Sequence, residues 1–310
     1  MSDSCIQVSN LVKTYKDITA VNDISFEVQK GEILGILGPN GSGKTTTMKS
    51  ILGLIEFDSG EIHVNEMSIQ KERKRIIADV GAILEGARNI YWHLSPRENL
   101  AYFAGIRGLS FKAVKERADY LLENLGLIDD ADKEIREFSA GMKQKSAMAC
   151  AFIHDPAILL LDEPTLGLDV EISRTIRNWL TEVVKNEKKT ILITSHNMDF
   201  VESTCNRILI IRNGEIISHE TLESLKEKFA RKFFKLTLDM EPSTSLLDSL
   251  DSIGDVSREG STVRISLENA NQIFPLVDVL KKADVNLKDF RTEENDLEEI
   301  FLEVIREKTQ

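Results

Sequence analysis

The sequence predicts an α/β fold built on a mostly parallel β-sheet, followed by a small α+β domain. The first observation is a series of short runs rich in Ile, Val and Leu, at residues 33–37, 158–162, 190–194 and 207–211. Helical stretches separate these runs, and strands that are apolar along their whole length are typical of a parallel sheet covered on both faces. The second observation is a change in the pattern of apolar residues after residue 231, where shorter predicted strands and helices alternate. We therefore expect two domains, residues 1–230 and 231–310.

The first domain is expected to combine antiparallel strands, the parallel sheet and a helical part. Residues 5–30 alternate between apolar and polar side chains, which predicts antiparallel strands joined by turns. Residues 96–127 are predicted to be helical, because Ser95-Pro96-Arg97-Glu98 has the form of a helix start. We expect a helical subdomain over about residues 86–155.

A strand at residues 215–218 and a charged helix at 221–229 are predicted to close the first domain. The second domain is predicted to contain strands at 234–238, 262–267 and 285–290 and helices at 243–250, 270–282 and 295–307. We interpret the order as β-α-β-β-α-β with a closing helix, which suits a small ferredoxin-like sandwich.

Charge and composition exclude several classes of function. The chain has 310 residues and a net charge of −12, and a nucleic-acid-binding protein needs clustered positive charge, so we expect no nucleic-acid partner. The scattered Cys5, Cys150 and Cys205 predict neither a disulfide framework nor a zinc site and favour a reducing compartment. There is no signal-like start and no apolar run near the ~20 residues of a membrane-spanning helix. Any membrane role must then depend on a partner.

A phosphate-binding loop lies between the run at 33–37 and a predicted helix, which is the context this motif requires. Gly41 and Gly43 allow successive backbone N–H groups to point at phosphate oxygens. Lys44 is expected to reach the β- and γ-phosphates, and the Thr45 hydroxyl to hold Mg²⁺. The predicted nucleotide-binding residues are Gly38, Pro39, Asn40, Gly41, Ser42, Gly43, Lys44, Thr45 and Thr46. This loop alone does not separate ATPases from GTPases or kinases.

Two carboxylates follow the apolar run 158–161. A strand of this kind carries Asp162 and Glu163 out of the sheet to the edge where phosphates bind. We expect Asp162 to orient Mg²⁺ and Glu163 to act as the general base, or to position water, for hydrolysis. The alternative is an acidic turn before Pro164, which a lone Asp-Glu pair would favour. The preceding phosphate loop favours catalysis.

Four motifs in a fixed order resemble the ATP-binding cassette (ABC) family of transporter ATPases. They are the phosphate loop, Phe138-Ser139-Ala140-Gly141-Met142, the run ending in Asp162-Glu163, and Ser195-His196. The usual form of the second motif is Leu-Ser-Gly-Gly-Gln, from which this chain departs at Phe138, Ala140 and Met142. The resemblance covers about residues 5–220 and implies a P-loop NTPase-type sheet with antiparallel β and helical subdomains. The matches at Ser139–Gly141 and His196 argue against another phosphate-loop enzyme such as a kinase.

The resemblance assigns roles to individual residues. His196 would touch the γ-phosphate and brace the catalytic glutamate. Ser139 and Gly141 would bind the γ-phosphate held by an opposite subunit, and Asp169 would belong to the loop that links the two active sites. Tyr15 would stack on adenine, although a lone tyrosine is more often ordinary packing.

Two further features precede the helical subdomain. Glu85 falls where many relatives have a glutamine that touches Mg²⁺ and the attacking water, and it would add negative charge near the phosphates. The following stretch holds Tyr91, Trp92 and His93 in a loop expected to be exposed. Exposed aromatic side chains are typical of interfaces, and in the family this region meets the membrane subunit. A small cluster packed under the loop is the equally weighted alternative.

The resemblance implies an ATP-hydrolysing motor subunit of an ABC membrane transporter. The tail 297–302 looks like that of drug, antibiotic and polymer exporters with a separate permease. Two copies, or one copy and a related cassette, would close around two ATP and Mg²⁺. The chain would be cytoplasmic, held at the inner face of the cell membrane by its permease. The alternatives are an importer ATPase with a ligand-sensing C-terminal domain, and a soluble ABC-type regulator without a permease.

Overall fold

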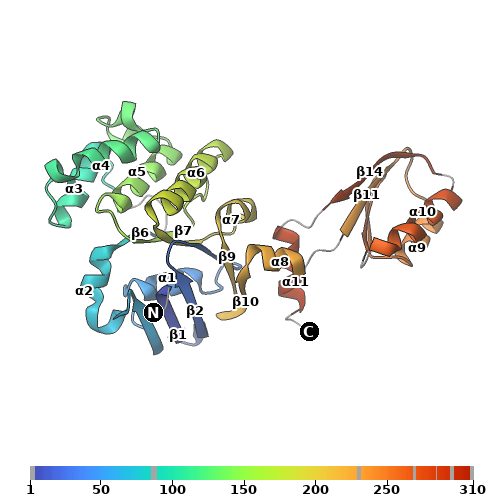
Figure 1. The fold of residues 1–310 in the computed structure, drawn as a ribbon, viewed down its shortest axis with the longest axis horizontal. Helices are drawn as coiled ribbons and strands as arrows, with labels where there is room; N and C mark the ends of the chain where they lie inside the picture. Colours follow the sequence, from blue (N-terminus) through green and yellow to red (C-terminus); the bar gives the residue numbers. More distant parts are fainter. Residues whose placement is uncertain are drawn as a thin grey trace. The chain divides into compact units, whose positions relative to one another are not determined.

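The chain forms two compact units, Met1–Leu222 and Glu223–Gln310. The computed structural model describes residues 4–84, 89–228, 232–267, 270–283, 285–293 and 297–307. The first unit contains an antiparallel sheet, a mostly parallel sheet and a group of helices, and the second contains one antiparallel sheet with its own helices (Figure 1). Each unit is described by itself.

The mostly parallel sheet has six strands in the order β10-β9-β3-β8-β7-β6. Its strands are β3 (Ile33–Leu37), β6 (Val80–Ile83), β7 (Ile158–Asp162), β8 (Thr190–Thr194), β9 (Arg207–Arg212) and β10 (Glu215–Thr221). Only the pair of β9 and β10 is antiparallel. In the register, Thr194 lies opposite both Ile36 and Asp162. Strand β3, which precedes the phosphate loop, and strand β7, which ends in Asp162, therefore lie on either side of Thr194.

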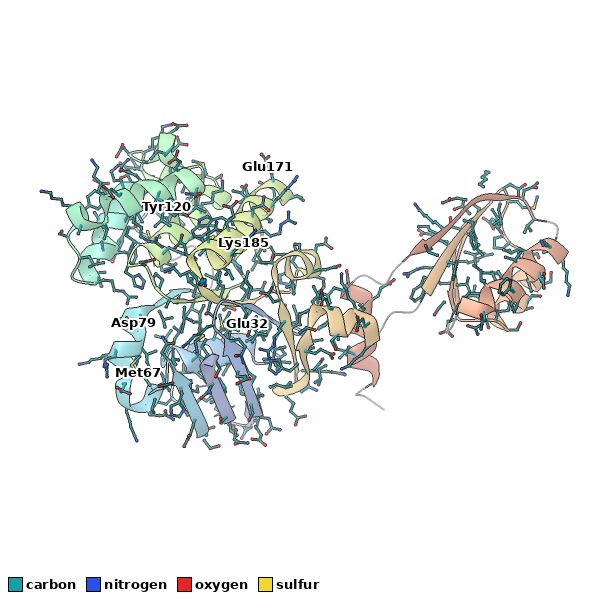
Figure 2. All side chains as sticks on the ribbon, in the orientation of Figure 1. Glu32, Met67, Asp79, Tyr120, Glu171 and Lys185 are labelled. Carbon is teal, nitrogen blue, oxygen red and sulfur yellow. The ribbon has the colours of Figure 1, made fainter. Side chains whose placement is uncertain are left out.

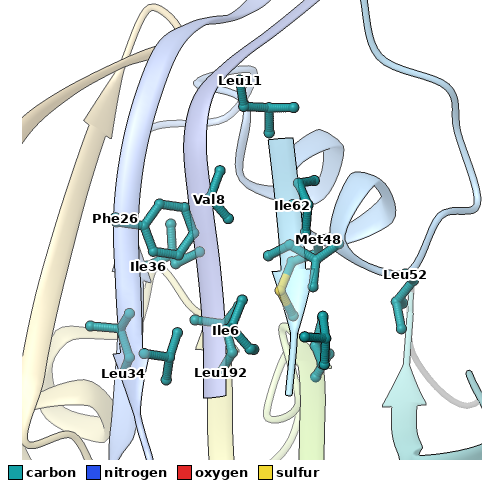
Figure 3. Close-up of a cluster of buried hydrophobic side chains, with 14 of the residues drawn as sticks. Ile6, Val8, Leu11, Phe26, Leu34, Ile36, Met48, Leu52, Ile62 and Leu192 are labelled. Carbon is teal, nitrogen blue, oxygen red and sulfur yellow. The ribbon is translucent and has the colours of Figure 1, made fainter. Parts of the chain in front are cut away.

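The second sheet of this unit is antiparallel, in the order β2-β1-β4-β5. Its strands are β1 (Ser4–Tyr15), β2 (Ile18–Gln29), β4 (Ser59–Val64) and β5 (Met67–Ser68). Side chains from both sheets and from helix α1 (Lys44–Ile51) form one buried apolar cluster, in which Ile6, Leu34 and Met48 are fully buried (Figure 3). This packing holds the phosphate loop between the two sheets.

Helices surround the two sheets. They are α2 (Ile69–Asp79), α3 (Pro96–Ile106), α4 (Phe111–Asn124), α5 (Ala140–Phe152), α6 (Val170–Glu187) and α7 (Met198–Thr204). Helix α8 (Leu222–Lys228) begins at the boundary between the two units. The predicted helix start at Ser95 is confirmed, because Glu98 N donates to Ser95 Oγ and Ser95 N donates to Glu98 Oε2. No helix in the described residues is long and apolar enough to cross a membrane.

The edge of the parallel sheet opposite the phosphate loop carries a buried ion pair. Glu32, labelled in Figure 2, lies just before β3 and accepts hydrogen bonds from Gln29 N at 2.6 Å and Arg207 Nη1 at 2.9 Å. Burial raises the pKa of the Glu32 carboxyl, and the contacts with Gln29 and Arg207 oppose that shift. This contact joins the turn before β3 to the start of β9.

The second unit is a four-stranded antiparallel sheet in the order β12-β13-β11-β14. Its elements are β11 (Lys232–Leu238), α9 (Thr244–Asp251), β12 (Val256–Glu259), β13 (Thr262–Leu267), α10 (Ile273–Lys282), β14 (Leu287–Glu293) and α11 (Leu297–Glu307). Leucines from α9 and α10 pack with the strands around Leu236 and Ile265. The predicted β-α-β-β-α-β order and closing helix are confirmed.

Several predicted elements differ from the structure at their ends. The predicted helical stretch 96–127 consists of α3 and α4, and a turn with Gly108 at φ 76° lies between them. The strand predicted at 285–290 runs from Leu287 to Glu293. The strand β12 was not located from the sequence, since Val256 is only partly buried and the next three residues are exposed.

Candidate functional site

The phosphate loop leads directly from β3 into α1. Gly41 and Gly43 have φ angles of 80° and 108°, a region that L side chains rarely adopt. A Cβ atom on Gly43 would lie 2.4 Å from the carbonyl oxygen of Ala20, so this glycine is also required by packing. No side chain caps α1, which leaves the first N–H groups of the helix for a ligand. An uncapped helix N-terminus behind a glycine-rich turn suits a phosphate group.

Lys44 is the buried cation of this loop. Its Nζ donates to Gly38 O at 2.7 Å and Pro39 O at 3.1 Å, and the residue is only 7% exposed. Desolvation lowers the pKa of Lys44, while the nearby Glu163 and Asp162 raise it. The ammonium group therefore sits on two carbonyls that an anionic phosphate could replace as its partner.

Asp162 is held by two hydroxyl groups at the end of β7. Thr45 Oγ1 donates to Asp162 Oδ2 at 3.0 Å, and Thr194 Oγ1 donates to Asp162 Oδ1. Asp162 is 3% exposed, so these bonds replace water around a buried carboxylate. The sequence pointed to Thr45 and Asp162 but missed Thr194. The sequence showed only that Thr194 is the last residue of the predicted run 190–194, because its pairing with Asp162 depends on the order of strands in the sheet.

Glu163 has a left-handed backbone, with φ of 50°. Its N–H donates to both the carbonyl and the hydroxyl of Thr194, each at 3.1 Å, and these bonds hold the unfavourable conformation. Its Oε2 lies 2.9 Å from His196 Nδ1 and 3.4 Å from His196 N. The carboxylate is thus turned toward the residue that follows Ser195 after β8. The structure brings the predicted pair Glu163 and His196 into direct contact.

The antiparallel sheet borders the phosphate loop on one side. Ala20 of β2 has the carbonyl oxygen that lies against Gly43. The other sheet also contacts the loop, because Gly214 N, in the turn between β9 and β10, donates to Ser42 O at 3.0 Å. Tyr15 pairs with Ile18 at the hairpin that leads to Ala20, and its ring is 45% exposed with Lys13 Nζ 5.0 Å from the centroid. An exposed ring on this hairpin suits stacking with a flat base.

Ser139, Gly141 and Asp169 form a separate group. Ser139 caps α5, its Oγ accepting from Met142 N at 3.2 Å, and Asp169 caps α6, its Oδ1 accepting from Ile172 N at 2.8 Å. Both residues are exposed. Within the described residues, no hydrogen bond or ion pair joins Ser139 or Asp169 to Lys44 or Glu163. This separation fits a role toward another chain.

The unusual form of the Ser139 motif does not disturb its backbone. Ala140 is the first residue of α5 and is absent from the non-glycine residues with positive φ, so its Cβ meets no conformational penalty. Phe138 is 6% exposed and packs inside the unit. Glu85, the third predicted magnesium ligand, lies outside the described residues.

The residues of the loop fit a bound nucleotide and its metal. Ser42 Oγ is buried and has no hydrogen-bond partner among the described residues. Thr45 and Asp162 place a hydroxyl and a carboxylate together, which are oxygen ligands of the kind that Mg²⁺ prefers. The phosphate loop and Lys44 therefore suit the phosphates of a nucleoside triphosphate, and the oxygens of Thr45 and Asp162 suit its Mg²⁺.

Two family models match the chain. A family model described as "ABC transporter" matches residues 21–166, and one described as "ATP-binding protein DrrA1-3-like, C-terminal domain" matches residues 221–305. The chain is 34% identical to the linearmycin resistance ATP-binding protein LnrL of Bacillus subtilis over 306 residues, 96% of this chain and 97% of LnrL. It is 31% identical to the bacitracin transport ATP-binding protein BcrA of Bacillus licheniformis over 301 residues, 97% of each.

A solved structure gives the same fold for the first unit. It is the dimeric, post-hydrolysis state of the ATP-binding cassette MJ0796 bound to ADP and Pi, with a TM-score of 0.65 and 26% identity. The match covers 70% of this chain and 98% of that chain. The predicted fold class and family are confirmed. The chain belongs to the ABC transporter family and is an ATP-binding, ATP-hydrolysing subunit of that family.

Proposed function

We propose that Glu163 is the general base of ATP hydrolysis in this chain and that His196 holds its carboxylate in place. The observation that supports this most strongly is the 2.9 Å contact between Glu163 Oε2 and His196 Nδ1 at the edge where the phosphate loop begins. Glu163 accepts the proton of the attacking water. Lys44 leaves its two carbonyl partners to bind phosphate oxygens and offsets their negative charge.

Thr45 and Asp162 are the proposed holders of Mg²⁺. Their oxygens already lie 3.0 Å apart, and Thr194 fixes the carboxylate from the other side. When bound, the cation would neutralise charge on the phosphate oxygens. Glu85 is a further proposed contact, and Tyr15 the proposed stacking partner of adenine.

The active unit is a dimer, with Ser139, Gly141 and Asp169 of one copy serving the ATP of the other. The exposed positions of Ser139 and Asp169 support this arrangement. So do the apolar side chains on either side of Asp169, since Leu166 is 62% and Val170 86% exposed. A second copy of this chain, or a related cassette, would cover them.

A separate membrane permease is the proposed partner of the loop after β6. Tyr91, Trp92 and Tyr102 are 46%, 48% and 42% exposed. Tyr91 OH donates to Tyr102 OH at 2.9 Å, and Lys143 Nζ lies 4.7 Å from the centre of the Trp92 ring. Ordered, exposed aromatic side chains of this kind are typical of interface anchors. They would hold the chain at the cytoplasmic face of the membrane.

Export is the proposed direction of transport. Two relatives that match over the full length, C-terminal unit included, are named for antibiotic resistance and antibiotic transport. The family match of residues 221–305 also groups the C-terminal unit with DrrA-like proteins. The importer with a ligand-sensing C-terminal unit stays an alternative, and a small molecule that binds residues 231–310 and lowers ATPase activity would favour it.

The proposed catalytic role is tested with Glu163→Gln. Because the side chain keeps its size but loses its basicity, we expect ATP binding within about twofold of wild type and hydrolysis reduced by at least about 100-fold. The matched control is Glu123→Gln, the same substitution at an exposed residue of α4, and this variant should hydrolyse ATP at the wild-type rate. Near-normal hydrolysis by Glu163→Gln would remove Glu163 from the mechanism.

The permease is tested by purifying the tagged chain from solubilised membranes of its own host. We expect an integral membrane protein to accompany it, and Trp92→Ala to weaken that association. Recovery of the chain only from the soluble fraction would favour the regulator without a permease.

A further inference from the structure

Gly141 is enclosed by a side chain of the same subunit. A Cβ atom on Gly141 would lie 2.0 Å from Ile172 Cδ1, 3.1 Å from Cγ1 and 3.2 Å from Cγ2. Gly141 has helical, not left-handed, backbone angles, so its lack of a side chain is needed for space and not for conformation. Ile172 therefore packs directly against the backbone of the first turn of α5.

The same isoleucine is tied to Asp169. Its backbone N donates to Asp169 Oδ1 at 2.8 Å, the capping bond that starts α6. Figure 2 labels Glu171, the neighbour of Ile172, in this first turn of α6. One residue thus contacts both elements that are offered to the opposite subunit, the Ser139 end of α5 and the Asp169 end of α6.

The Asp169 loop is in turn tied to Glu163 of its own chain. Leu166 N donates to Glu163 O at 3.2 Å, and Leu168 N donates to Thr165 O at 3.2 Å, so consecutive turns connect Glu163 with the start of α6. A second α5–α6 contact lies further along both helices, where the Phe152 and Trp179 rings are 4.3 Å apart. This second contact joins the two helices away from the ends at which Ile172 meets Gly141.

We propose that Ile172 is a positioning residue that holds Ser139 and Asp169 in one fixed arrangement, so that a single rigid surface meets the ATP of the partner subunit. The inference rests on the proposed dimer. Its consequence is that truncating Ile172 should loosen the surface offered in trans while leaving the phosphate loop of the same chain intact. Gly141 then has a second role, because its lack of a side chain leaves the space that Ile172 fills.

The test uses the full chain carrying Glu163→Gln, with Mg-ATP-driven dimerisation and ATP affinity of the monomer measured side by side. Ile172→Ala should weaken dimerisation by about tenfold and leave ATP affinity within about twofold. Ile172→Val keeps both γ carbons and removes only Cδ1, so it should weaken dimerisation less than Ile172→Ala. Leu180→Ala, a truncation of a fully buried residue elsewhere on α6, controls for lost stability and should leave dimerisation unchanged in the folded protein.

A double substitution separates packing from direct phosphate contact. Gly141→Ala alone should weaken dimerisation by about 100-fold, because its Cβ collides with Ile172. Adding Ile172→Ala makes room for that Cβ and should recover about tenfold. No recovery, or unchanged dimerisation by Ile172→Ala, would overturn the inference while the dimer stands. Failure of the Glu163→Gln parent to dimerise would overturn the proposed dimer and the inference together.

Discussion

Replacing Thr194 by valine should impair hydrolysis without unfolding the site. Valine keeps the branched shape but removes the hydroxyl, which donates to Asp162 Oδ1 and accepts from Glu163 N. Asp162 keeps Thr45 as a partner at 3.0 Å, and Glu163 N keeps the Thr194 carbonyl at 3.1 Å. The loss is therefore mainly one hydrogen bond to a buried carboxylate.

The size of the effect follows from that bond. A hydrogen bond to a charged group contributes about 1.5–3 kcal/mol. If the whole loss falls on the transition state, kcat decreases by about 10- to 150-fold, since each 1.36 kcal/mol is about tenfold in rate. The affinity for ATP should change less, because Lys44 and the phosphate loop remain.

The assay is steady-state ATP hydrolysis at saturating Mg²⁺, with nucleotide affinity and thermal stability measured on the same samples. Thr194→Ser is the matched control, as it keeps the hydroxyl and loses only the methyl group. A Thr194→Val protein whose kcat stays within about twofold of wild type would refute the reasoning. So would a Thr194→Ser protein as impaired as Thr194→Val.

Three further predictions concern parts of the chain away from Thr194. Burial lowers the pKa of His154 from 6.5 to about 4, so the unfolded state binds more protons than the folded state in this range. The free energy of unfolding should therefore fall as the pH decreases from 6.5 to 4, and His154→Gln should flatten this slope in urea titrations. Gly43→Ala should lose measurable ATP binding in calorimetry, whereas Gly31→Ala, at φ 74° with nothing within 4 Å, should keep it. Leu236→Ala should destabilise the second unit by about 2–5 kcal/mol in calorimetric melting while ATP affinity is unchanged.

The parts of the fold that could be predicted are those with a strong local signal. The apolar runs at β3, β7 and β8 are buried along their whole length, so their composition alone identifies them. Ser95 and Glu98 predict the start of α3, because the capping contacts between them lie within one turn. Strand β12 carries no such signal, since its side chains are mostly exposed.

The parts of the site that could not be predicted depend on contacts between distant segments. Thr194 acts through its register beside Asp162, which only the pairing of β7 and β8 determines. The packing of Ile172 against Gly141 joins two helices, and nothing in the sequence around either residue predicts that the two are in contact. The left-handed backbone of Glu163 is likewise unexpected for a non-glycine residue and depends on hydrogen bonds to Thr194.

The composite active site is tested most directly by the solution mass of the Glu163→Gln protein with and without Mg-ATP. We predict a change from the 34.9 kDa monomer to a species of twice that mass when Mg-ATP is added. Ser139→Arg on the same background should abolish the change and keep ATP binding, because the bulky cation would stand where the second copy approaches. A protein that binds Mg-ATP and stays monomeric would contradict the account, since each active site would then lack its second half.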